Sequence, residues 1–171
     1  MTENSKRLIR DIKNLLKDSE ESLVLESGVY CAKIINDSMN KIYICMIGPK
    51  DSPYENCILP IIIEPNPKTN KFHSKFIDGK GYPYNPPLVE FICPYSIRIH
   101  PNLYKDGKVC LTLLGTWSES GNTDIWIPSY SFISIIQQIF GICDNEPLRG
   151  EPGYRTGRDE CVKSYTDYVR Y

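Results

Sequence analysis

The sequence is poor in the groups that most metal and nucleic-acid sites require. Its 171 residues include only His73 and His100 as histidines and no C-x-x-C pair, so a zinc site is poorly supported. The 20 Lys and Arg are balanced by 21 Asp and Glu, without the basic excess of proteins that neutralise nucleic-acid phosphates. The longest apolar stretch, residues 57–63, is too short to cross a bilayer. We therefore expect no metal, nucleic-acid or membrane partner.

Seven cysteines are present, an odd number with no even framework of disulfide pairs. They are Cys31, Cys45, Cys57, Cys93, Cys110, Cys143 and Cys161. No charged-then-apolar signal peptide opens the chain. Reduced thiols in a soluble cytoplasmic protein are the expectation, and a nuclear location is also compatible with them. The length fits one domain spanning residues 1–171.

The first half of the chain predicts one helix followed by a sheet. Apolar residues recur with a helical period over 6–17, and the opposite face is basic. That face is either an ordinary solvated surface or a docking surface for an acidic partner. Short β-branched and aromatic runs predict four strands, at 29–35, 41–47, 58–63 and 88–92. Short turns between strands favour an antiparallel meander, with Pro60 at a bulge or an edge.

The second half alternates irregular segments with two helices. Residues 65–82 have the composition of an insertion with a mobile tip, and 82–87 that of a stiff polyproline-like corner. Residues 95–121 lack regular periodicity, which in a compact domain is typical of a functional segment. A mostly apolar helix is predicted at 131–143, capped by Ser129 or Ser131, and a short one at 159–169 with Val162, Tyr165 and Val169 inward. The fold class is α+β.

The segment most informative about chemistry is residues 98–117. A His-Pro-Asn tripeptide ends at Asn102, eight residues before Cys110, and a Lys-Asp-Gly turn lies between them. Such a loop can fold the Asn102 amide back toward the Cys110 sulfur. An amide donor beside a thiol suits thioester chemistry, because the tetrahedral intermediate carries an oxyanion.

His100 has two interpretations. It could act as a base that activates Cys110, as in thiol hydrolases. It could equally be a structural residue whose ring hydrogen-bonds the loop, an interpretation favoured by the rigid neighbour Pro101. A hydrolase also needs a group that orients the base, and the sequence displays none.

Three motifs occur in an order that resembles the ubiquitin-conjugating enzyme family. They are MIGPKDSPYENC (46–57), YPYNPPLVEF (82–91) and IHPNLYKDGKVCLTLLGTW (99–117), within a resemblance that covers about residues 6–150. The stretches NLYKDGKVCLTLLGTW and NEPLRGEPGYR (145–155) are most similar to the conjugating domains of very large hybrid conjugating enzyme/ligases. The resemblance implies a UBC fold with a long active-site loop between the sheet and a buried central helix.

The resemblance also implies roles for individual residues. Cys110 would accept ubiquitin as a thioester from the activating enzyme and pass it to a lysine. Asn102 would stabilise the oxyanion or order the loop, and His100 would be structural. Glu146, before Pro147 and Leu148, would help to desolvate or deprotonate the incoming lysine. No cofactor or metal is implied.

Partner surfaces follow from the same resemblance. The basic face of the first helix would dock the activating enzyme through Lys6, Arg7, Arg10 and Lys13. A ubiquitin ligase would contact Tyr84 and the loop formed by Trp126, Ile127 and Pro128. Trp117 is the rival for the role of Trp126, which is favoured by its shorter spacing to the buried helix.

Two segments depart from the family pattern, the insertion near 65–82 and the extra residues 118–125.

Two alternatives share the same fold: a non-catalytic ubiquitin-binding scaffold and a conjugating enzyme for another ubiquitin-like modifier. The presence of Cys110 argues against the scaffold. The modifier itself leaves no readable pattern in the sequence.

Overall fold

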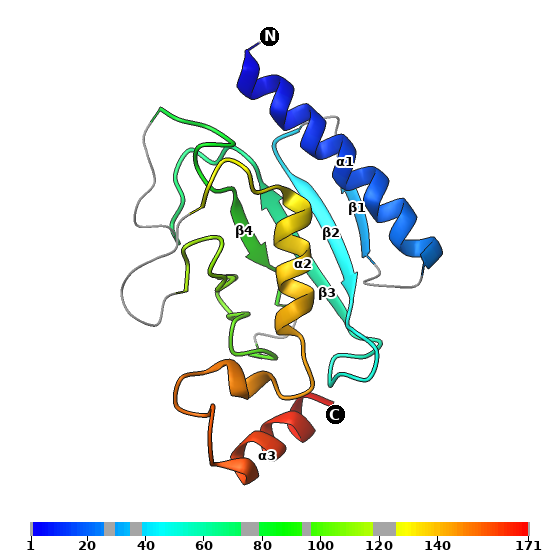
Figure 1. The fold of residues 1–171 in the computed structure, drawn as a ribbon, viewed down its shortest axis with the longest axis vertical. Helices are drawn as coiled ribbons and strands as arrows, with labels where there is room; N and C mark the ends of the chain where they lie inside the picture. The colour runs from blue at the N-terminus through cyan, green and yellow to red at the C-terminus, as the bar shows by residue number, and fades with distance from the viewer. Residues whose placement is uncertain are drawn as a thin grey trace.

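The structure, a computed structural model, describes residues 2–25, 30–34, 39–72, 79–93, 97–117 and 126–170 (Figure 1). Its elements in chain order are α1 (Glu3–Leu25), β1 (Tyr30–Ile34), β2 (Ile42–Ile47), β3 (Ile58–Glu64), β4 (Leu88–Phe91), α2 (Phe132–Ile142), the 3₁₀ helix η1 (Pro147–Gly150) and α3 (Asp159–Arg170). This order confirms the α+β prediction.

The sheet is the predicted antiparallel meander, with strand order β1-β2-β3-β4. Side chains alternate along β2 and β3 between a buried and a more exposed face, as the period of two requires. The buried face includes Ile42, Ile44, Met46, Leu59, Ile61 and Ile63. Helix α2 lies across the sheet, and α1 packs against β1 and α2 (Figure 1).

Pro60 interrupts neither the strand nor its register, and β3 lies between β2 and β4, so the prediction of a bulge or an edge is wrong. It pairs with Cys45 in a continuous β2–β3 ladder. The Gly48 N–H donates to the Cys57 carbonyl at 2.9 Å. Along an antiparallel ladder, hydrogen-bonded pairs alternate with pairs that share no hydrogen bond. Counting from Gly48 and Cys57, Pro60 and Cys45 form a pair without a hydrogen bond, so the missing N–H of Pro60 is not needed there. On the other side, the Pro60 carbonyl accepts from Ile92 N–H just beyond the end of β4.

Helix α1 is longer at both ends than the predicted 6–17. The Thr2 hydroxyl accepts a hydrogen bond from Ser5 N–H and so caps the N-terminus. Beyond residue 17 the inward face continues with Ser19 and Ser22, which are buried. Their hydroxyls donate to the carbonyls of Leu16 and Ser19, so polar residues extend a helix whose apolar stripe has ended.

The two later helices match the predictions closely. Ser131 caps α2 in a reciprocal pair with Ser134, which decides between the two expected caps. On α3, Val162 is buried and Tyr165 and Val169 are half-buried.

The corner at 82–87 is a tight turn, contrary to the predicted extended polyproline segment. Tyr84 N–H donates to the Gly81 carbonyl at 3.0 Å, and the Tyr82–Pro83 peptide bond within this turn is cis. Residues 73–78 of the predicted 65–82 insertion and all of 118–125 lie outside the described residues.

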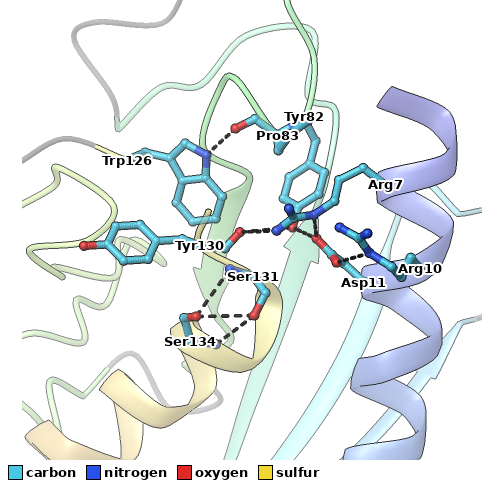
Figure 2. A network of polar contacts seen from close by, with 9 residues as sticks. All are labelled: Arg7, Arg10, Asp11, Tyr82, Pro83, Trp126, Tyr130, Ser131 and Ser134. Carbon is cyan, nitrogen blue, oxygen red and sulfur yellow. Dashed lines mark hydrogen bonds and ion pairs between the residues drawn. The ribbon is translucent and has the colours of Figure 1, made fainter. Parts of the chain in front are cut away.

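A buried polar network joins α1 to the loops before β4 and before α2 (Figure 2). The Asp11 carboxylate accepts from Arg7 Nε at 2.5 Å and from the Tyr82 hydroxyl at 2.6 Å. The Arg7 guanidinium also donates to the Tyr130 carbonyl at 3.2 Å. Burial and the Asp11 carboxylate raise the pKa of Tyr82, so its hydroxyl stays protonated and remains a donor.

We predict that Tyr82→Phe lowers the free energy of unfolding by about 1.5–3 kcal/mol, because it removes a buried hydrogen bond to a charged group. Urea denaturation would measure this change. The matched control is Tyr84→Phe in the same turn, whose exposed ring predicts a change within about 0.5 kcal/mol. Equal midpoints for the two variants would contradict the stabilising role of the network.

Candidate functional site

The segment from Asn102 to Cys110 forms a small hairpin, as the Lys-Asp-Gly turn predicted. Cys110 N–H donates to the Asn102 carbonyl at 2.8 Å. Gly107 closes the turn with a φ of 91°, a conformation that glycine adopts without strain. Leu103 and Val109 form a β-bridge and are buried in the core, so they anchor the hairpin from beneath.

The Cys110 thiol lies almost covered at the end of this hairpin. The residue is 3% exposed, and its Sγ donates to the Thr116 carbonyl at 3.2 Å. Burial raises the pKa of the Cys110 thiol, and the neighbouring Lys108 and Tyr104 act in the opposite direction. The thiol is therefore mainly protonated at neutral pH.

Asn102 contacts the backbone of Cys110 rather than its sulfur. Its Nδ2 donates to the Cys110 carbonyl at 2.9 Å. The prediction that the Asn102 amide folds toward the Cys110 sulfur is therefore wrong. The hairpin pairs the two residues directly, and the short amide side chain reaches the Cys110 carbonyl instead. In this arrangement Asn102 orders the loop, one of the two roles expected of it.

His100 is a buried structural residue. Its Nδ1 accepts the Asn102 N–H at 2.8 Å, which leaves the ring proton on Nε2 to donate to the Ile142 carbonyl at 2.8 Å. Burial lowers the pKa of His100 to about 4. The neutral ring has both nitrogens occupied away from Cys110, so the thiol-hydrolase interpretation loses its base.

A cavity of about 190 Å³ opens beside Cys110. Residues of four segments line it, including Asn102, Cys110, Thr112, Trp117, Gln138, Asp144, Pro147 and Gly150. Gln138 of α2 ties the turn after Cys110 in place, since its Nε2 donates to Thr112 Oγ1 at 2.6 Å. Trp117 thus lines this cavity, whereas Trp126 contacts the loop at Pro83. Gln138 carried no signal in the sequence beyond the helical pattern.

The acidic residue on the cavity wall is Asp144, not the predicted Glu146. The Glu146 carboxylate is exposed and pairs with Arg149 Nε at 3.5 Å on the rim. Asp144 is also an exposed residue, but partial desolvation of its carboxyl group raises its pKa, although one of its oxygens accepts the Glu146 N–H at 2.9 Å. Asp144 follows the end of α2 by two residues, so the length of that helix is the signal that could have identified it.

The basic face of α1 divides into outward and inward residues. Lys6, Arg10 and Lys13 are exposed and line a shallow groove on the helix surface. The side chain of Arg7 is 24% exposed and is turned inward to Asp11 and Tyr130 (Figure 2). Arg7 is therefore a structural residue of the network rather than a free cation of the predicted docking face.

The two loops predicted to contact a ligase lie side by side. Trp126 Nε1 donates to the Pro83 carbonyl at 2.7 Å and joins them (Figure 2). Trp126 is only 4% exposed, so it supports the surface instead of forming it. Tyr84 and Ile127 are 49% and 46% exposed, and Pro128 beside them is also exposed.

Within the described part of the chain, no group of three or more His, Cys, Asp or Glu could hold a metal ion. No helix among the described residues is long and apolar enough to span a membrane.

Comparison with known proteins agrees with the fold. The structure superposes on the E2 domain of a Toxoplasma gondii ubiquitin conjugating enzyme with a TM-score of 0.61 and 19% identity, covering 97% of this chain and 93% of that one. A Plasmodium falciparum ubiquitin conjugating enzyme E2 gives a TM-score of 0.56 at 20% identity, covering 82% and 83%.

The sequence comparisons reach the same family. The chain is 29% identical over 168 residues to "Ubiquitin-conjugating enzyme E2 Z" of Danio rerio, covering 96% of this chain and 44% of the relative. It is 34% identical over 119 residues to the human "Dual E2 ubiquitin-conjugating enzyme/E3 ubiquitin-protein ligase BIRC6", covering 67% of this chain and 2% of that protein. This likeness confirms the predicted similarity to hybrid enzymes. The chain thus spans less than half the length of these relatives, but residues 7–168 match the family described as "Ubiquitin-conjugating enzyme", and the chain belongs to that family.

Proposed function

We propose that this chain accepts the C-terminus of ubiquitin as a thioester on Cys110 and transfers it to a lysine amine. The observation that carries the proposal is the position of Cys110. Its thiol lies at the wall of a cavity that also holds Asn102 and Asp144, in a chain of the ubiquitin-conjugating enzyme family.

The chemistry needs no cofactor from this domain. The Cys110 thiolate attacks the thioester carbonyl carbon that joins ubiquitin to a cysteine of the activating enzyme, and that enzyme's thiolate leaves. A deprotonated lysine amine then attacks the new thioester, the Cys110 thiolate leaves, and an isopeptide bond forms. An amide donor at the developing oxyanion lowers the barrier to attack by the lysine, and the Asn102 amide already hydrogen-bonds the Cys110 carbonyl in the hairpin.

The incoming lysine requires a group that takes or orients its proton. Asp144 is suited to this role because it lies on the cavity wall and its pKa is raised by partial burial. Glu146 is held by Arg149 on the rim, outside the cavity lining.

Two surfaces remain for protein partners. The exposed cations Lys6, Arg10 and Lys13 suit an acidic surface on the activating enzyme. The exposed apolar residues Tyr84, Ile127 and Pro128 suit a ligase. The seven free cysteines suit a reducing compartment such as the cytoplasm.

Cys110 is the nucleophile in this proposal. With ubiquitin, a ubiquitin-activating enzyme and ATP, Cys110→Ala should form no adduct, and Cys110→Ser should form an oxyester that resists thiol reductants. Gels with and without reductant would show both. Cys161→Ala, which removes an exposed cysteine of α3, is the control and should charge normally. A reductant-sensitive band in Cys110→Ala would place the thioester on another residue.

Asn102→Ala should separate the two steps. We expect charging within a few-fold of the unaltered chain, and discharge to free lysine slower by about 10², the effect of removing one oxyanion donor. Single-turnover discharge of a preformed thioester would measure this rate. If charging and discharge slow equally, Asn102 acts only by ordering the loop.

Asp144→Asn and Glu146→Gln form a matched pair for the acidic residue. Replacing Asp144 should slow discharge to lysine by about 10–10², a typical general-base contribution at its lower end. Replacing Glu146 should change discharge less than about threefold, because its carboxylate lies outside the cavity lining. The assay is discharge of the preformed thioester, with charging as the internal control. A larger loss for Glu146→Gln would reverse the assignment.

A further inference from the structure

One face of the active-site hairpin carries a second set of polar side chains. Asn102 and Cys110 are paired by the hydrogen bond from Cys110 N–H, and Tyr104 and Lys108 are paired by one from Tyr104 N–H to the Lys108 carbonyl at 2.9 Å. Successive side chains of an extended strand alternate between faces. Asn102, Tyr104, Lys108 and Cys110 therefore share the outer face of the hairpin.

This register brings the two polar residues within reach of the nucleophile. Lys108 is two residues before Cys110 on the same arm of the hairpin, and Tyr104 lies diagonally across from Cys110 on the other arm. Diagonal neighbours in an antiparallel pair have Cα atoms about 7–8 Å apart, a distance that aromatic and long side chains bridge. A hydroxyl and an ammonium can thus both approach the Cys110 thiol.

The Tyr104 ring contacts two cations. The Arg98 guanidinium lies 4.0 Å from the ring centroid, and Lys108 Nζ lies 5.6 Å from it. The ring is half-buried, which limits the positions open to its hydroxyl. The cluster therefore places positive charge beside the nucleophile on a fixed support.

The remaining charges near Cys110 oppose a thiolate. Burial raises the pKa of Cys110 most, Glu151 raises it further, and Asp144 is a second carboxylate on the wall of the same cavity. Lys108 and Tyr104 are the side chains that lower this pKa. Without Lys108 and Tyr104, a Cys110 thiolate would be buried near the carboxylates of Glu151 and Asp144, with no side chain to stabilise its charge.

We propose that the Lys108 ammonium and the Tyr104 hydroxyl stabilise the thiolate form of Cys110 and so promote its attack on the incoming thioester. This inference rests on the proposed function for the identity of that thioester. The proton that Cys110 loses passes to a base in solvent, and the departing thiolate of the activating enzyme takes one up, so the exchange is balanced. Arg98 acts on the thiol only by positioning the Tyr104 ring.

The test is the pH profile of Cys110 alkylation in the reduced, full chain. Iodoacetamide reacts with the thiolate, and tandem mass spectrometry assigns the modification to Cys110 among the seven cysteines. Lys108→Met keeps the aliphatic stem but removes the charge, and Lys108→Arg retains the charge. Lys105→Met, an exposed lysine of the same turn, is the matched control. Tyr104→Phe removes the hydroxyl and keeps the ring on which Arg98 stacks.

Lys108→Met should shift the profile upward by about one pH unit, since each unit in pKa is a tenfold change in thiolate at a pH below both midpoints. Ubiquitin charging at neutral pH should then fall by only about threefold. The thiolate is about tenfold scarcer, but a more basic thiolate is a better nucleophile, which offsets part of the loss. Tyr104→Phe should shift the profile in the same direction, and Lys108→Arg and Lys105→Met should match the unaltered chain.

Superimposable profiles for Lys108→Met and Lys105→Met, with both proteins folded by circular dichroism, would overturn the inference. The alkylation readout uses no ubiquitin. If the unaltered chain fails to charge while the Lys108→Met profile still shifts, the proposed function fails and the thiolate support stands.

Discussion

A single buried imidazole connects the nucleophile's loop to the end of the central helix. The His100 ring takes the Asn102 N–H on one nitrogen and donates to the Ile142 carbonyl with the other. The Tyr54 ring lies against it, 5.5 Å between centroids, and the Tyr54 hydroxyl donates to the Ile99 carbonyl. The described part of the loop, residues 97–117, contains no helix or strand of its own, so its buried backbone groups depend on such side-chain partners.

This connection explains why residues far apart in sequence form one cavity. The imidazole fixes Asn102 relative to Ile142, and the hairpin fixes Cys110 relative to Asn102. Asp144 follows Ile142 by two residues and therefore comes to the same wall. Because the neutral His100 does not act on the thiol, other side chains must stabilise the thiolate, and Tyr104 and Lys108 of the hairpin are the candidates.

The two candidate partner surfaces share a second support. Asp11 faces inward from α1 and holds Arg7 and the Tyr82 hydroxyl, and Arg7 reaches the Tyr130 carbonyl (Figure 2). The exposed cations of α1 and the exposed loops at Tyr84 and Ile127 are thus parts of one rigid arrangement. The buried Asp11 carboxylate is tolerated because both of its oxygens have partners.

Features that depend on neighbouring residues in the sequence were predicted correctly. Short β-branched and aromatic runs identified the four strands, and the Lys-Asp-Gly turn identified the hairpin that pairs Asn102 with Cys110. Other features depend on tertiary contacts that no local pattern records. The inward turn of Arg7 needs Tyr130, 123 residues away, and the burial of Trp126 needs the Pro83 carbonyl. The motif around Pro147 pointed to Glu146, whereas the cavity wall is set by where α2 ends, at Ile142, and so selects Asp144.

The measurement that tests the central claim most directly is the intact mass of the unaltered chain after incubation with ubiquitin, a ubiquitin-activating enzyme and ATP. A thioester on Cys110 predicts a mass increase of one ubiquitin less one water, lost completely on treatment with a thiol reductant. An unchanged mass, while the activating enzyme itself becomes charged, would contradict the assignment of this chain as an acceptor of ubiquitin.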